Sequence, residues 1–150
     1  MKYATLGIIL LASSSVCFAG SYGTQFTFVN NSNYELTKIA SYSSGMDWNF
    51  PDSISAKKTI QTRIAFNIPW FGSVLDDYGS VSYQATCPAG DQVIRVLTEV
   101  VDYDYLDGTH AYTGAGFPIN SYGANCVSIQ PASGDEVGFV QDSNSVLTIN

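Results

Sequence analysis

Val81-Ser82-Tyr83-Gln84-Ala85-Thr86-Cys87 is the stretch of sequence that decides the fold. Val81, Tyr83, Ala85 and Cys87 alternate with polar residues. Successive side chains of an extended chain point to opposite faces, so this alternation places the apolar side chains together on one face. The pattern predicts a half-buried β-strand.

Similar patterns recur along the chain, and no segment after residue 19 shows sustained helical periodicity. Phe26–Phe28 and Thr59–Phe66 alternate in the same way, and Val93–Val101 is apolar on both faces, which predicts a central strand. Val137–Gln141 and Val146–Ile149 flank a short polar turn and predict a terminal hairpin. Seven to nine short strands separated by Asn-, Ser-, Gly- and Asp-rich turns predict an all-β fold. We expect an antiparallel β-sandwich, with a β-barrel as the second choice.

The N-terminus has the layout of a secretory signal peptide. Lys2 gives a positive start, Leu6–Leu11 is a compact apolar run, and a small-residue segment ends at Ala19. The apolar run is too short for a membrane anchor, which needs about 20 apolar residues. We therefore expect cleavage of residues 1–19 and export of residues 20–150, as a single β-sandwich domain, to the periplasm or the medium.

Removal of residues 1–19 would leave two cysteines, Cys87 and Cys126. An even pair in an exported chain predicts one disulfide. Closing this loop would stabilise the fold by roughly 4 kcal/mol on the chain-entropy model.

The net charge of −7 argues against two classes of partner, nucleic acids and anionic lipid surfaces. Neutral lipids, glycans, cations and basic proteins remain. His110 is the single histidine and the chain has no Gly-x-Ser-x-Gly motif, so we expect no enzyme and assign no catalytic residue. A carboxylate-based hydrolase stays open as an alternative, because the spatial separation of carboxylates is not visible in a sequence.

An acidic segment supplies the candidate metal ligands Asp102, Asp104 and Asp107. Convergent carboxylates suit calcium, although Leu106 and Thr113 stand where a helix-loop-helix calcium site needs oxygen ligands. The alternative is a solvated turn that keeps the chain soluble. No other cofactor is expected.

Aromatic residues supply the candidate ligand-binding side chains. If the loops around them are exposed, they form an apolar surface for a membrane or ligand, and if they fold inward they cap the sandwich. Tyrosines of the acidic segment can stack on a sugar or lie half-buried in strands. The candidates are Trp48, Phe50, Trp70, Phe71, Tyr103, Tyr105 and Tyr112.

Part of the chain resembles the aegerolysin family. The resemblance rests on Phe26–Ser32 with its Asn/Ser turn, on the aromatic stretch Trp48–Pro51, and on the glycine-led strand Gly79–Tyr83. It implies a small β-sandwich that binds membrane lipids, sometimes beside a separate pore-forming partner.

These observations favour an exported, non-enzymatic protein that binds a membrane lipid or a glycan through aromatic loops. One alternative is a calcium-dependent carbohydrate-binding module or the carboxylate-based hydrolase. Another is a structural or inhibitory surface protein that recognises a basic partner.

Overall fold

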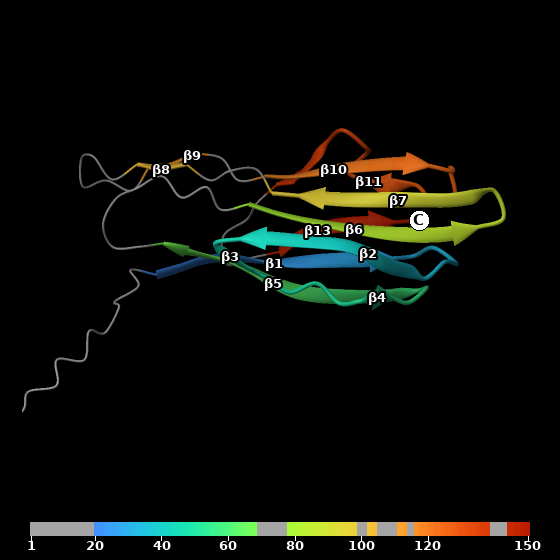
Figure 1. The fold of residues 1–150 in the computed structure, drawn as a ribbon, viewed down its shortest axis with the longest axis horizontal. Helices are drawn as coiled ribbons and strands as arrows, with labels where there is room; N and C mark the ends of the chain where they lie inside the picture. Colours follow the sequence, from blue (N-terminus) through green and yellow to red (C-terminus); the bar gives the residue numbers. More distant parts are fainter. Residues whose placement is uncertain (1–19, 69–77, 99–101, 105–110, 114–115, 139–143) are drawn as a thin grey trace, which may run out of the picture.

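The computed structural model describes residues 20–68, 78–98, 102–104, 111–113, 116–138 and 144–150. Over these residues the chain is all β, with two sheets packed around one hydrophobic core, which confirms the predicted sandwich (Figure 1). A two-stranded ribbon of β8 (Asp102–Asp104) and β9 (Ala111–Thr113) lies at one end of the sandwich. Among all the residues that the structure describes, no helix has the length and apolar character to cross a membrane.

The first sheet has five strands in the order β11-β13-β1-β5-β3. They are β1 (Gly20–Asn30), β3 (Met46–Trp48), β5 (Lys58–Ile68), β11 (Ile129–Gln130) and β13 (Asn144–Ile149). β1 lies at the centre, antiparallel to β5 and parallel to β13. We had expected a wholly antiparallel sandwich. Instead, β1 and β13 lie side by side and run in the same direction.

The second sheet has six strands in the order β12-β10-β7-β6-β2-β4. They are β2 (Leu36–Ser44), β4 (Ser53–Ile54), β6 (Tyr78–Cys87), β7 (Gly90–Leu97), β10 (Gly116–Gly123) and β12 (Glu136–Gly138). In β6, Val81, Tyr83 and Ala85 are buried, as their alternation predicts. β7 lies between β6 and β10, which confirms a central strand at the start of Val93–Val101.

The predicted terminal hairpin is wrong, because β12 and β13 belong to different sheets. Val137 of β12 pairs with Phe117 of β10, whereas Val146 of β13 pairs with Thr27 of β1. Val137 and Leu147 both face the core, but from opposite sides. Burial of each apolar face, rather than closeness in sequence, selects the partner strand.

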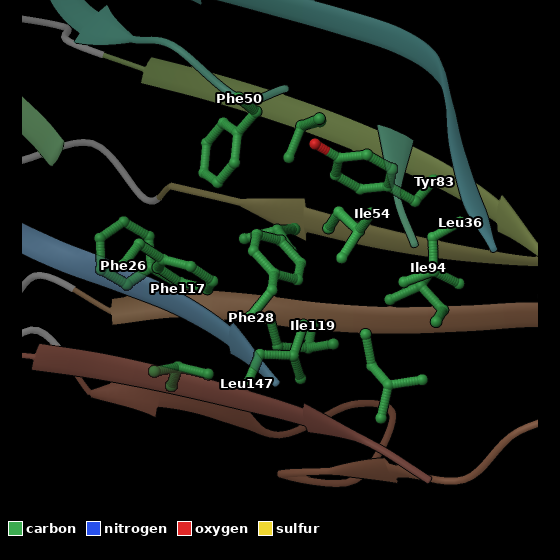
Figure 2. Packing of buried hydrophobic residues seen from close by; sticks show 14 of the residues in the cluster. Phe26, Phe28, Leu36, Phe50, Ile54, Tyr83, Ile94, Phe117, Ile119 and Leu147 are labelled. Carbon is green, nitrogen blue, oxygen red and sulfur yellow. The ribbon is translucent and has the colours of Figure 1, made fainter. Parts of the chain in front are cut away.

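Aromatic rings fill the centre of the core (Figure 2). The ring centroids of Phe26 and Phe28 are 5.0 Å apart, those of Phe26 and Phe117 5.1 Å, and those of Phe28 and Tyr83 5.5 Å. Each such ring contributes roughly 1.5–3 kcal/mol by leaving water. The Tyr83 hydroxyl donates a 2.7 Å hydrogen bond to the carbonyl oxygen of Pro51, and burial raises the pKa of Tyr83 well above its usual value.

The predicted Cys87–Cys126 disulfide is present and joins the end of β6 to the segment after β10. A buried amide, Gln92, holds the same segment. Its Oε1 accepts hydrogen bonds from the main-chain N–H groups of Cys126 (2.7 Å) and Val127 (2.8 Å). Its Nε2 donates to Ser121 Oγ (2.7 Å) and to the Val127 carbonyl oxygen (3.0 Å). All four hydrogen-bonding positions of this amide are thus filled.

Candidate functional site

Trp48 and Phe50 are core residues. Their side chains are only 7 % and 5 % exposed, and their ring centroids lie 4.6 Å apart. Phe50 also packs at 5.8 Å from Phe26 and at 5.6 Å from Phe28. The structure therefore shows the inward arrangement of this aromatic segment. The ligand-binding role that we predicted for Trp48 and Phe50 needs exposed rings, and a buried ring offers a ligand no surface, so this part of the prediction is corrected.

Four of the other candidates, Trp70, Phe71, Tyr105 and Asp107, lie outside the described residues. The two remaining tyrosine candidates lie in the ribbon of β8 and β9, whose main-chain register pairs Tyr103 with Tyr112. Their roles in ligand binding stay predictions.

The acidic candidates Asp102 and Asp104 lie in β8, where the main chain of Asp102 pairs with Thr113 and that of Asp104 with Ala111. Among the residues that the structure describes, no group of three or more His, Cys, Asp or Glu side chains is placed to hold a metal ion. Calcium binding stays a prediction, and a rise in melting temperature at millimolar calcium would support it by linkage.

Exposed aromatic side chains gather on the outer face of the second sheet instead. Among the described residues, the large apolar or aromatic side chains that are exposed are Ile39, Tyr42, Tyr78, Tyr122 and Val146. The first four come from β2, β6 and β10 of this one sheet, and only the last belongs to the other sheet.

The register explains why three tyrosines share this face. In β6 the odd-numbered Val81 faces the core, so the even-numbered Tyr78 and Ser80 face outward. Tyr42 pairs with Ser80 and shares its face. Tyr122 faces outward as well, because it pairs with Val93, which in turn pairs with the outward Gln84 of β6.

Tyr42 and Tyr78 form a ring pair on this surface. Their centroids are 5.0 Å apart at an interplanar angle of 34°, yet 53 % and 41 % of the two residues remain exposed. Tyr122, 49 % exposed, lies diagonally across the sheet, three strands and four residues away. At strand spacings of about 4.8 Å and rises of about 3.3 Å per residue, the pair and Tyr122 are about 20 Å apart.

Polar side chains occupy the space between these aromatic ends. Ser82 of β6 pairs with Arg95 of β7, which pairs with Asn120 of β10, and all three are half-buried. They supply a hydroxyl, a guanidinium and an amide in one row. We call this surface the tyrosine face, defined by Tyr42, Tyr78, Ser82, Arg95, Asn120 and Tyr122.

A β-bulge marks the border of the tyrosine face. The pairing of β2 with β6 shifts between Lys38 and Ala40, which leaves Ile39 as the extra residue. Next to it the Lys38 ammonium lies 2.7 Å from Asp52 Oδ1 and donates to the Phe50 carbonyl oxygen at 2.8 Å. The hydrogen bond and charge of Lys38 hold the pKa of the exposed Asp52 carboxyl below its usual value. This ion pair fastens the loop before β4 to the sheet edge.

Sequence reasoning missed Tyr42, Tyr78 and Tyr122. One signal was present, because extending the alternation of Val81–Cys87 backwards places Tyr78 on the polar, outward face. Tyr42 and Tyr122 had no such signal, since their faces depend on pairing with strands that are distant in the sequence.

No family model and no curated protein matches this chain. The resemblance to aegerolysins therefore stays a prediction, and the geometry carries the functional argument.

Proposed function

We propose that this chain is an exported, non-enzymatic binding protein that holds a glycan on its tyrosine face. The observation that carries the proposal is the ring pair of Tyr42 and Tyr78, which lies exposed on a sheet instead of in the core. Export is supported by the N-terminal sequence pattern, and the Cys87–Cys126 disulfide is compatible with an oxidising compartment.

The chemistry of the tyrosine face favours sugar over lipid. A pyranose ring has an apolar C–H face that packs on an aromatic ring, and hydroxyl groups around its rim. Tyrosine offers a flat apolar ring with a polar tip, and Ser82, Arg95 and Asn120 add hydrogen-bonding groups between the aromatic ends. Insertion into a bilayer favours a continuous apolar surface, and this polar row interrupts it.

The separation of the aromatic ends indicates the size of the ligand. A span of about 20 Å, from strand spacing and rise, exceeds a single sugar and suits a chain of several residues. We therefore expect an oligosaccharide or a polysaccharide surface to bind more tightly than a monosaccharide.

The test is calorimetric titration with soluble hexasaccharides of β-linked glucose and of N-acetylglucosamine, beside pull-down on insoluble cellulose and chitin. The double substitution Tyr42→Ala and Tyr78→Ala should weaken glycan binding by at least tenfold, about 1.4 kcal/mol. Val146→Ala is the matched control, because Val146 is similarly exposed but lies on the other sheet. Exposed substitutions of this kind leave the free energy of unfolding within about 1 kcal/mol.

Two outcomes would overturn the proposal. One is the absence of binding to any of these glycans by the folded protein. The other is sedimentation with neutral liposomes that depends on Tyr42 and Tyr78, which would assign the tyrosine face to lipid.

A further inference from the structure

A groove of about 740 Å³ lies where the open edges of the two sheets meet. It is lined by the end of β11 and the loop after it, from Gln130 to Ala132, by Asp135 and β12, and by Val146 and Thr148 of β13. β12 and β13 touch here, where Ser145 Oγ donates a 2.8 Å hydrogen bond to the Gly138 carbonyl oxygen.

The main chain of β13 opens into this groove. Asn150 and Ser128 exchange two main-chain hydrogen bonds of 2.8 and 2.9 Å, so the even-numbered residues of β13 direct their N–H and C=O groups toward β11. β11 ends at Gln130, whose register partner is Thr148, so the pairing of β11 with β13 does not reach Val146. The N–H and C=O of Val146 therefore point past the end of β11, and the described part of the chain supplies no partner for them on that side.

The main chain of β12 opens into the groove as well. Ile119 N–H donates to the Asp135 carbonyl oxygen at 2.9 Å, so odd-numbered residues of this segment bond to β10. Glu136 and Gly138 then face away from β10, and the Gly138 carbonyl oxygen is the one that accepts from Ser145. Within the described residues, the N–H and C=O of Glu136 have no main-chain partner. Among the residues that the structure describes, one stretch of β13 and one of β12 thus lack a main-chain partner on the side of this groove, and such stretches can accept an added strand.

The charge of the groove indicates what kind of strand fits. Asp135 and Glu136 are the charged residues among those that line it, and both are exposed. A second copy of this chain would bring the same carboxylates and a further net charge of −7, so like charges would meet. A segment with Lys or Arg side chains instead places opposite charges beside these carboxylates.

We propose that this groove binds an extended, basic segment of a partner protein by main-chain pairing with Val146 and Glu136. Lys or Arg side chains of that segment lie beside Asp135 and Glu136. The inference is independent of glycan binding, because the groove and the tyrosine face share no residue.

Hydrogen exchange of the ¹⁵N-labelled protein tests the free edges. The amides of Val146 and Glu136 should exchange rapidly, whereas those of Leu147 and Val137, which face paired strands, should be protected. The probe is an acetylated eight-residue peptide of alternating Lys and Thr. Its addition should slow exchange at Val146 and Glu136, and a peptide of alternating Glu and Thr should not.

Substitutions separate main-chain pairing from general attraction. Val146→Pro removes the N–H that faces the groove, on the side of β13 that lies beyond the end of β11, and should weaken binding of the Lys-Thr peptide at least tenfold. Val146→Ala keeps the N–H and should bind as the unaltered protein does. Asp135→Asn with Glu136→Gln should weaken binding and flatten its dependence on salt.

Slow exchange at both amides in the free protein, no binding of the Lys-Thr peptide, or equal binding by Val146→Pro and Val146→Ala would each overturn the proposal. A concentration-dependent dimer that Val146→Pro abolishes would place a second copy in the groove and overturn it too. Loss of peptide binding in the Tyr42→Ala, Tyr78→Ala protein would do the same, since it would move the peptide to the tyrosine face.

Discussion

Replacing Gln92 with methionine removes four hydrogen bonds from the core while nearly keeping the side-chain volume. The Gln92 side chain is only 3 % exposed, and it bonds to Ser121, Cys126 and Val127. At a net value of about 1 kcal/mol each, these bonds amount to about 4 kcal/mol. The more apolar methionine offsets about 1 kcal/mol of that loss. We therefore expect Gln92→Met to lower the free energy of unfolding by about 3 kcal/mol.

Urea denaturation followed by circular dichroism, with the disulfide intact, measures this change. Gln84→Met is the matched control, because Gln84 lies on the outer face of β6 and its amide makes only a 3.4 Å contact with Thr86 Oγ1. That variant should stay within about 0.5 kcal/mol of the unaltered protein. If Gln92→Met loses less than 1 kcal/mol, or no more than Gln84→Met, the buried amide does not hold the segment after β10.

Two further predictions concern buried positions, Gly79 beside Trp48 and Tyr83. Gly79→Ala should destabilise the fold by about 1–3 kcal/mol in the same assay, because a Cβ at Gly79 would lie 2.8 Å from the Trp48 ring. The control is Gly138→Ala, where a Cβ meets no atom within 4 Å, and it should change the free energy of unfolding little. Burial raises the pKa of Tyr83 above its ordinary 10.0, so the stability that its neutral hydroxyl contributes is complete below pH 10 and declines as pH rises further. Tyr83→Phe should reduce this alkaline loss of stability, measured as melting temperature against pH, and an unchanged profile would contradict the assignment.

Local alternation predicted part of β1, β5, β6 and β7, but it did not single out β2 or β10, and the two sheets hold eleven strands in the described part of the chain where seven to nine were expected. It also did not predict which strands are partners. The strand at Val81–Cys87 could be predicted because one face of β6 contacts the core and the other contacts solvent. The parallel pairing of Phe26 with Ser145 could not be predicted from the local sequence, because parallel and antiparallel strands show the same alternation of side chains. The polar stretch of sequence between Val137 and Val146 suggested a hairpin, because strands that are close in sequence often pair, but they need not do so.

The candidate binding surface was harder to predict than the fold. Trp48 and Phe50 precede Pro51 in a pattern that suits an exposed loop or a core contact equally well. Trp48 is buried in the core cluster, where Gly79, on a strand of the other sheet, leaves room for its ring. Tyr42 stands among serines, and only its register opposite Ser80 shows that it faces outward. Contacts between segments that are distant in the sequence therefore decide both the burial of Trp48 and the outward orientation of Tyr42.

The parallel pairing of β1 with β13 also makes completion of the core depend on strands from opposite ends of the described chain. Thr24 and Ser145, 121 residues apart, have hydroxyl oxygens within 3.3 Å. Until Leu147 and Ile149 have left the ribosome, the central strand lacks a neighbour and the core lacks two fully buried side chains. The core of the growing chain therefore stays incomplete until β13 has been made, because its contacts with β1 are non-local. A chain that completes its core last gives any machinery that threads unfolded polypeptides the longest time to engage it.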